Sequence, residues 1–253
     1  MIEIKNIEKS FGENKILKGI STTFETGKTN LIIGQSGSGK TVLLKSLLGI
    51  HHPEVGTIEF DGRVYSSLED DEKRELRTEI GMVFQGSALF DSMTVAENVA
   101  FPLKMFTRDN KAKIKERVDF VLERVALQEA HNKLPSEISG GMQKRVAIAR
   151  AIVNRPKYLF CDEPNSGLDP NTSILIDNLI KEITEEYDIT TVINTHDMNS
   201  VMEIGEKILF LKDGLKAWEG NKEEIFKTDN EDVIAFVYSS NLFKKVREAY
   251  LKE

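Results

Sequence analysis

The sequence predicts an α/β fold with an inserted helical stretch, and three observations lead to this prediction. A short apolar strand at residues 31–33 runs into a glycine-rich loop, which opens a helix at residues 41–50. A second apolar strand, at residues 158–161, ends in two adjacent carboxylates. Between these segments, residues 92–152 have helical spacing and contain no strand candidate, so they are expected to form a helical lobe.

Strand patterns flank the helical lobe on both sides. Residues 1–30 alternate between apolar and polar side chains, with turn signals at residues 11–14 and 26–28. The last residues of the chain, from about 234 to 250, have approximately helical spacing. Further strands are expected at residues 57–62, 80–84, 190–194, 207–212 and 216–218, with a helix at 172–187 and a hairpin turn at Asp213-Gly214.

Composition and charge narrow the classes of function. The 253 residues carry a net charge of −7, and their lysines and arginines are scattered, which argues against a nucleic-acid-binding face. Cys161 is the single cysteine, so no internal disulfide forms and a reducing compartment is indicated. The opening residues indicate a strand rather than a signal peptide. No apolar run reaches the roughly 20 residues that span a bilayer, so a membrane passage would need another chain.

The glycine-rich loop has the pattern of a phosphate-binding loop, because it follows a strand and opens a helix. Backbone N–H groups of such a loop surround the β- and γ-phosphates of a nucleotide, where the helix dipole also favours negative charge. Lys40 is expected to reach the phosphate oxygens and Thr41 to ligate Mg²⁺. The alternative is a glycine-rich turn that only starts a helix. The loop consists of Gly34, Gln35, Ser36, Gly37, Ser38, Gly39, Lys40 and Thr41.

The acidic pair Asp162-Glu163 is expected to supply the carboxylates that a nucleotide-hydrolysing site needs beside its phosphate-binding loop. It follows a buried apolar strand, at the sheet edge where ligands bind in open α/β sheets. Asp162 is expected to hold the Mg²⁺ shell and Glu163 to orient the attacking water. An isolated acidic pair in this position is more often a helix cap or a solvated turn, but the glycine-rich loop upstream favours the catalytic interpretation.

A second glycine motif lies within the helical lobe. Ser139, Gly140, Gly141 and Met142 precede a helix expected at residues 143–153 and form a second anion-binding nest. A single chain that binds one nucleotide has little need for two anion-binding nests on separate lobes. In a head-to-tail dimer both are used, because the second nest of one chain closes on the γ-phosphate held by the other chain. The alternative is that Ser139 serves only as the N-cap of the helix.

Three further polar residues follow in an order that supports a nucleotide site. Gln85 ends the strand at 80–84 and can contact the metal or the water. Asp169 follows Glu163 within Ser166-Gly167-Leu168-Asp169, and His196 follows the strand at 190–194, from where it can reach the γ-phosphate. The other three histidines, His51, His52 and His131, are interpreted as ordinary surface or core residues.

Together, these residues resemble the ATPase domain of ABC transporters over residues 1–225. The resemblance implies a P-loop NTPase core of the RecA-like type, with an antiparallel β subdomain and a helical lobe at about 92–152. It assigns Gly34–Thr41 to the Walker A motif, Gln85 to the Q-loop and Asp162 to Walker B, with Glu163 and His196 as catalytic residues and Phe11 stacking on adenine. It also implies that a second copy of the chain contributes Ser139, Gly140, Gly141, Met142 and Asp169 to the ATP site, and that an integral-membrane permease is the partner.

Two departures from the common family pattern point to a narrower resemblance. Ile138 and Met142 replace residues of the usual Leu-Ser-Gly-Gly-Gln motif, and residues 85–103 are similar to the phospholipid-transport ATPases of the Mla and Mce systems. This resemblance implies lipid cargo, an Mce-type lipid-binding protein and a position on the cytoplasmic face of the bacterial inner membrane. The helical extension at 226–253 is expected either to grip the partner ATPase or to pack on its own domain.

Other functions of the same family remain as alternatives. The chain could serve an amino-acid or metal importer, since an ATPase subunit does not touch the cargo. It could also be a non-transport ABC ATPase that regulates a membrane complex, as in the cell-division relatives. An ABC ATPase acting on nucleic acid or the ribosome is disfavoured, because the chain is acidic, has no basic patch, and carries neither a long coiled coil nor a second ATPase domain.

Overall fold

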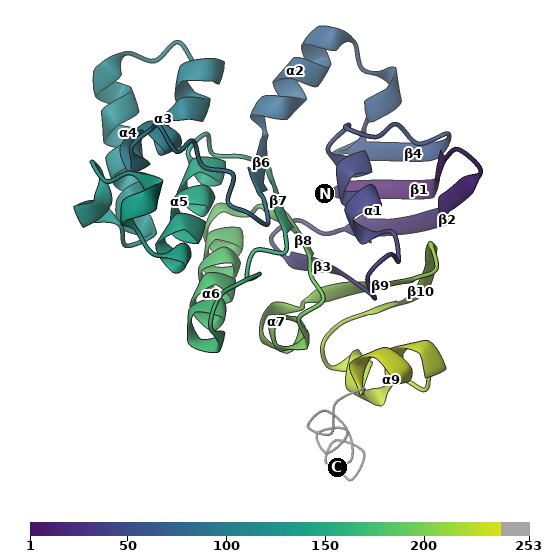
Figure 1. The fold of residues 1–253 in the computed structure, drawn as a ribbon. Coiled ribbons are helices and arrows are strands. Elements are labelled where there is room, and N and C mark those ends of the chain that lie inside the picture. The colour runs from purple at the N-terminus through teal and green to yellow at the C-terminus, as the bar shows by residue number, and fades with distance from the viewer. Residues whose placement is uncertain (239–253) are drawn as a thin grey trace. The chain divides into compact units, whose positions relative to one another are not determined.

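The computed structural model describes residues 1–238, and the chain divides into two compact units (Figure 1). Unit 1 comprises Met1–Leu68 and Val192–Glu253, and unit 2 comprises Glu69–Thr191. The strand β8 (Thr190–Asn194) lies where the chain passes from unit 2 back into unit 1. Each unit contains strands and helices, and the two units are considered separately.

Unit 1 contains an antiparallel sheet with the strand order β2-β1-β4-β5. Its strands are β1 (Ile2–Phe11), β2 (Asn14–Phe24), β4 (Val55–Phe60) and β5 (Arg63–Val64). Ile2, Ile4 and Ile7 of β1 are buried, with a register shift between Ile4 and Ile7, and Ile2 pairs with both Phe24 and Phe60. The strands predicted within residues 1–30 therefore belong to an antiparallel sheet, and their apolar side chains lie on its buried face.

Unit 1 also contains the parallel strand pair that carries the glycine-rich loop. All five residues of β3 (Thr29–Ile33) are buried, and β3 pairs in parallel with β9 (Lys207–Lys212). The strand β10 (Leu215–Gly220) returns antiparallel to β9 through a turn in which Asp213 and Gly214 have φ values of 51° and 78°. This confirms the predicted hairpin. The helices α1 (Lys40–Leu47) and α7 (Met198–Ile204) complete this part of unit 1.

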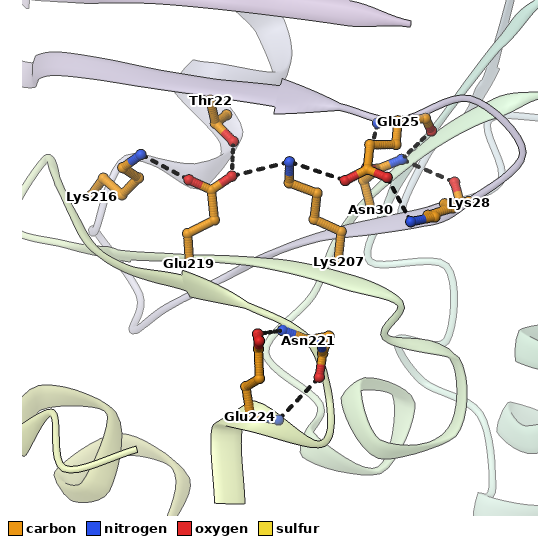
Figure 2. Close-up of polar contacts among 9 residues, drawn as sticks. All are labelled: Thr22, Glu25, Lys28, Asn30, Lys207, Lys216, Glu219, Asn221 and Glu224. Atoms are coloured by element: carbon orange, nitrogen blue, oxygen red, sulfur yellow. Dashed lines mark hydrogen bonds and ion pairs between the residues drawn. The ribbon is translucent and has the colours of Figure 1, made fainter. Parts of the chain in front are cut away.

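The half-buried Glu219 side chain connects β2 with β9 and β10 within unit 1 (Figure 2). Thr22 of β2 donates a hydrogen bond to Glu219 of β10 over 2.5 Å. Lys207 of β9 lies 3.2 Å from the same carboxylate and Lys216 lies 2.8 Å from it. Hydrogen bonds from Lys216, Thr22 and Lys207 lower the pKa of Glu219, although burial alone would raise it.

The described part of the C-terminal extension packs on unit 1. Two short helices, α8 (Glu224–Lys227) and α9 (Glu231–Val237), follow β10. The ring of Phe236 stacks on that of Phe210 at a centroid distance of 5.1 Å, and the Tyr238 hydroxyl donates to the Ile225 carbonyl over 3.2 Å. Residues 226–238 thus contact their own unit, whereas the remainder of the predicted helical pattern lies outside the described residues.

Unit 2 consists of two parallel strands and a set of helices. The strands β6 (Ile80–Val83) and β7 (Tyr158–Asp162) pair directly. Figure 1 shows α3, α4 and α5 gathered in one helical cluster, within the stretch for which helices were predicted. The helices of unit 2 are α2 (Asp70–Thr78), α3 (Val95–Phe106), α4 (Lys111–Arg124), α5 (Gly140–Ile152) and α6 (Pro170–Tyr187).

Two features of unit 2 differ from the sequence prediction. The helix α2 was not predicted, because its sequence DDEKRELRT has a single buried side chain, Leu76, and so lacks an apolar stripe. A capping box between Glu69 and Glu72 stabilises its first turn instead. The helix α5 begins at Gly140, three residues before the predicted start at 143, because Ser139 caps it. Within residues 1–238, no helix combines the length and the apolar character that crossing a bilayer requires.

Candidate nucleotide site

The glycine-rich loop connects β3 to α1 in unit 1, and two of its glycines are required by the backbone. Gly34 has a φ of 150°, and a Cβ atom there would lie 2.3 Å from the Leu211 carbonyl oxygen. Gly39 has a φ of 103° and forms the N-cap of α1. No other residue type fits the close approach at Gly34, so the loop packs directly on the backbone of β9.

The side chains of Lys40 and Ser38 are buried within this loop. Lys40 is 7% exposed, and its Nζ donates to the carbonyl oxygens of Gly34 and Gln35 over 2.9 and 3.1 Å. Ser38 is 5% exposed, and its Oγ has no hydrogen-bond partner within residues 1–238. A buried hydroxyl without a partner costs about 1–3 kcal/mol, so an oxygen-rich anion in the loop would supply what the hydroxyl lacks. The loop therefore fits a phosphate group.

The end of β8 meets the start of α1 within unit 1. Asn194 Nδ2 donates to Thr41 Oγ1 over 3.3 Å, and the Thr195 amide donates to the Ile32 carbonyl over 3.1 Å. Thr41 and His196 are both exposed. These hydrogen bonds hold the end of β8, which precedes His196, next to the glycine-rich loop. This position is consistent with the predicted approach of His196 to a phosphate.

Phe11 ends β1 and keeps an accessible ring. Its side chain is 46% exposed, with the edge of His51 at a centroid distance of 5.1 Å and Lys9 Nζ at 5.4 Å from the ring centroid. An exposed aromatic face can stack on a base, as the sequence predicts for adenine. The contact of His51 with this ring was not predicted, since the sequence offers no sign that the two residues meet.

In unit 2, β7 delivers the acidic pair at the end of a buried strand. The first four residues of β7 are fully buried, Asp162 is half-buried, and burial raises the pKa of the Cys161 thiol. Glu163 has a φ of 45°, a left-handed conformation that is uncommon for a glutamate. The turn closes with a hydrogen bond from the Ser166 amide to the Glu163 carbonyl over 3.1 Å. Backbone strain of this kind is frequent at functional sites.

The structure brings two of the predicted catalytic residues together. Gln85 Nε2 lies 3.2 Å from Glu163 Oε2 and 3.2 Å from Ser166 Oγ. Gln85 begins the Q-loop, defined here as residues 85–90, which follows β6. Because β6 and β7 are neighbouring parallel strands, their carboxyl ends bring these side chains to the same edge.

The second glycine motif, Ser139–Met142, starts α5 and lies close to α6. Ser139 Oγ accepts a hydrogen bond from the Met142 amide over 3.2 Å, so the serine does cap the helix. A Cβ atom at Gly141 would lie 2.7 Å from Thr172 Cγ2, so this glycine allows the two helices to approach. Capping and anion binding are compatible, because the remaining N–H groups at the start of α5 stay available.

Asp169 stands beside this motif at the start of α6. It accepts a hydrogen bond from the Thr172 amide over 3.1 Å, and hydrogen bonds from Thr172 lower the pKa of Asp169. A hollow of 760 Å³ is lined by the Ser139–Met142 motif, by Gly167–Asp169 and by residues of α6. All five residues predicted to act on the partner's nucleotide, namely Ser139, Gly140, Gly141, Met142 and Asp169, thus line one hollow.

Two basic residues of α5 hold the Q-loop, and neither was predicted as part of the site. Lys144 donates to the Gln85 carbonyl, and Arg150 donates to the carbonyls of Ser87 and Ala88 over 2.7 and 2.8 Å. One signal was present in the sequence. Lys144 precedes Ala147, Ile148 and Ala151 at the i, i+3, i+4 and i+7 spacing of a buried helix face, where a lysine is unusual.

The predicted Mg²⁺ ligands have suitable chemistry but come from both units. Thr41 belongs to unit 1, and Gln85 and Asp162 belong to unit 2. Hydroxyl, amide and carboxylate oxygens are the hard ligands that Mg²⁺ prefers. Among the residues that the structure describes, no group of three or more His, Cys, Asp or Glu side chains is arranged to hold a metal ion.

Comparisons with known proteins agree with this geometry. The family model described as "ABC transporter" matches residues 17–166. The chain is 40% identical over 226 residues to a methionine import ATP-binding protein MetN of Clostridioides difficile (strain 630), covering 89% of this chain and 70% of the relative. It is 37% identical over 236 residues to a probable ribonucleotide transport ATP-binding protein mkl of Mycobacterium leprae (strain TN), covering 93% of this chain and 68% of the relative.

A solved structure has the same fold. It is a dimeric structure of a post-hydrolysis state of the ATP-binding cassette MJ0796, bound to ADP and Pi. Its TM-score with this chain is 0.79 at 35% sequence identity, over 88% of this chain and 99% of that chain. With the family model matching more than half of the sequence, the chain belongs to the ABC transporter family, as an ATP-binding subunit that hydrolyses ATP.

Proposed function

We propose that two copies of this chain bind two ATP molecules in composite sites, each made by the glycine-rich loop of one copy and the Ser139–Met142 motif of the other. The observation that carries this proposal is the 760 Å³ hollow of unit 2, which gathers Ser139–Met142 and Asp169 around a helix N-terminus. Such an N-terminus is suited to a phosphate. The similarity to a cassette that is dimeric with ADP and Pi supports it.

Within each composite site, the residues of unit 1 hold the nucleotide. Phe11 stacks on the adenine, and the loop from Gly34 to Thr41 surrounds the phosphates with backbone N–H groups. Lys40 exchanges the carbonyls of Gly34 and Gln35 for phosphate oxygens, which are stronger acceptors. His196 approaches the γ-phosphate from the end of β8.

The residues of unit 2 act on the attacking water and on the metal. Gln85 and Asp162, with Thr41 of unit 1, would hold Mg²⁺, which would neutralise developing charge on the phosphates. Glu163 accepts a hydrogen bond from the attacking water and orients it in line with the γ-phosphate. Gln85 keeps this carboxylate in place through the hydrogen bond of 3.2 Å.

The composite site predicts a dimer that depends on ATP. Glu163→Gln keeps the shape of the side chain but removes the carboxylate, so bound ATP should persist and the variant should run as a dimer. Size-exclusion chromatography with light scattering, with and without Mg·ATP, measures this. The double variant Glu163→Gln/Lys40→Ala is the matched control and should stay monomeric. A Glu163→Gln chain that remains monomeric with saturating ATP, also alongside its permease, would overturn the composite site.

We further propose that the subunit works peripherally on the cytoplasmic face of a bacterial inner membrane, with a separate permease and an Mce-type protein, and that the cargo is phospholipid. Residues 85–103 and the Ser-Gly-Gly-Met motif support this, because they resemble the phospholipid-transport ATPases. The acidic chain, with a net charge of −7, does not favour nucleic acid as a partner.

Amino-acid import is a second candidate, because the chain is 40% identical to a methionine import ATP-binding protein. Purification of the complex from native membranes separates the candidates. A permease with an Mce-type protein and bound phospholipid, identified by mass spectrometry, is the expected result. A permease with an amino-acid-binding protein would contradict lipid transport, and a single division-type membrane protein would indicate a regulatory role instead.

A further inference from the structure

The helix α5 holds the Q-loop through its basic side chains. Lys144 lies in the first two turns of α5, is 5% exposed, and donates a hydrogen bond to the backbone carbonyl of Gln85. The side-chain amide of the same glutamine lies 3.2 Å from the Glu163 carboxylate. Lys144 therefore holds the backbone of the residue whose side chain contacts the proposed catalytic carboxylate.

Arg150 fixes the next part of the Q-loop. Its guanidinium donates to the carbonyls of Ser87 and Ala88 over 2.7 and 2.8 Å. These two residues have φ values of 60° and 47°, so two consecutive non-glycine residues are left-handed. The left-handed conformation is unfavourable for residues with a Cβ atom, so the loop conformation depends on contacts of this kind.

From the opposite side, Asn98 of α3 fixes the segment that follows. It is fully buried, its Nδ2 donates to the carbonyls of Phe90, Met93 and Thr94, and its Oδ1 accepts from the Phe90 amide. The Q-loop is thus held at its start by Lys144, at its centre by Arg150 and at its end by Asn98. Of these contacts, only that of Lys144 acts on Gln85 itself.

A neutral side chain could cap the Gln85 carbonyl at lower cost than a lysine. Burial lowers the pKa of Lys144, which shows that its environment disfavours the ammonium form, although the nearby charge of Glu163 favours it. Removing an ammonium group from water costs several kcal/mol. A charged donor beside Gln85 and Glu163 therefore indicates a role that a neutral hydrogen bond would not fulfil.

We propose that Lys144 is a positioning residue for ATP hydrolysis, which fixes the backbone of Gln85 so that the Gln85 amide stays on the Glu163 carboxylate. Lys144 lies on the helix that Ser139 caps. This inference rests on the proposed roles of Ser139, Gln85 and Glu163.

The first test compares Lys144→Met with Arg117→Met in steady-state ATPase assays. Arg117 is the matched control, because it donates to the carbonyls of Ile152 and Val153 at the other end of α5 and does not contact the Q-loop. Lys144→Met should lower kcat by about 10- to 100-fold, with the KM for Mg·ATP within about threefold of wild type. Arg117→Met should lower the Tm without this loss of kcat.

A double-mutant cycle with Gln85→Ala tests whether Lys144 acts through Gln85. If it does, Lys144→Met should reduce kcat by less than about twofold in the Gln85→Ala background. Independent losses that multiply would overturn the proposal. Should Lys144→Met fail to fold, Lys144→Gln takes its place, since it keeps an N–H donor without the charge. If Lys144→Gln has the same kcat as Arg117→Met, this result would also overturn the proposal.

The outcomes separate this inference from the proposed function. If Glu163→Gln or Gln85→Ala hydrolyses ATP at the wild-type rate, the proposed catalytic roles fail whatever Lys144 does. If both lose activity while Lys144→Met retains it, the catalytic roles stand and only the positioning role of Lys144 fails.

Discussion

Gln85 and Glu163 are 78 residues apart in the sequence, yet Gln85 Nε2 lies 3.2 Å from Glu163 Oε2. Their meeting follows from the pairing of β6 with β7, which brings the ends of two parallel strands to one edge. The amide donor limits the rotation of the carboxylate that we propose orients the attacking water molecule. The position of Glu163 therefore depends on the Q-loop as well as on its own strand.

Replacing Glu163 by glutamine should slow hydrolysis by about 10²–10⁴-fold, because the water loses the negatively charged carboxylate that polarises it. This corresponds to about 3–5 kcal/mol of barrier. ATP affinity should change little, since the side chain keeps its size. Phosphate release under saturating ATP measures the rate, and a turnover equal to wild type would exclude Glu163 from the role proposed.

Replacing Lys40 by alanine should weaken nucleotide binding itself. The ammonium group leaves the Gly34 and Gln35 carbonyls for phosphate oxygens, and a charge-assisted contact of this kind contributes about 1.5–3 kcal/mol. The Kd for ATP should rise by about 10- to 100-fold in calorimetric titrations. Lys45→Ala, an exposed lysine on the same helix, is the control and should bind normally. Unchanged affinity of Lys40→Ala would count against the phosphate contact.

The glycine-rich loop offers a matched pair of stability variants. A Cβ atom at Gly34 meets the Leu211 carbonyl at 2.3 Å, whereas Gly37 is left-handed with no atom near its added Cβ. Gly34→Ala should therefore lose about 2–4 kcal/mol of unfolding free energy, and Gly37→Ala about 1 kcal/mol. Urea unfolding monitored by circular dichroism compares them. Equal losses would show that the loop does not pack on β9 as described.

The Glu219 network predicts a dependence of stability on pH. The folded-state pKa of Glu219 lies below the ordinary value of 4.5, so its carboxylate stabilises the fold above that pH. This contribution is lost as the pH falls through the folded-state pKa. Glu219→Gln should lower the Tm by about 2–4 °C at pH 7 and by less near pH 3.5. Glu13→Gln, in the exposed turn after β1, is the control, and a constant difference for Glu219→Gln across this range would contradict the network.

The parts of the site that the sequence predicted are those encoded locally. The glycine-rich loop and the acidic pair each follow a buried apolar strand, and their geometry depends on neighbouring residues. The hairpin turn at Asp213-Gly214 also depends only on neighbouring residues, and the structure confirms this turn. The helix α2 was missed because charged residues fill it and a capping box, rather than an apolar stripe, stabilises it.

The parts that were missed depend on contacts between distant segments. Gln85 and Lys144 lie 59 positions apart, and the sequence gives no sign that this lysine caps a backbone carbonyl. The lysine on an apolar helix face was visible, but its partner was not.

The central claim is that Lys40 and Ser139 act on one ATP from two different chains, and mixing two inactive variants tests it. Lys40→Ala loses the phosphate contact, and Ser139→Glu places a negative charge against the γ-phosphate, so neither variant should hydrolyse ATP alone. A mixed dimer contains one intact site, made by Lys40 of the second variant and Ser139 of the first. ATPase activity that returns on mixing, up to about a quarter of wild type for random pairing of independent sites, is the predicted result. A mixture as inactive as its components would contradict the account.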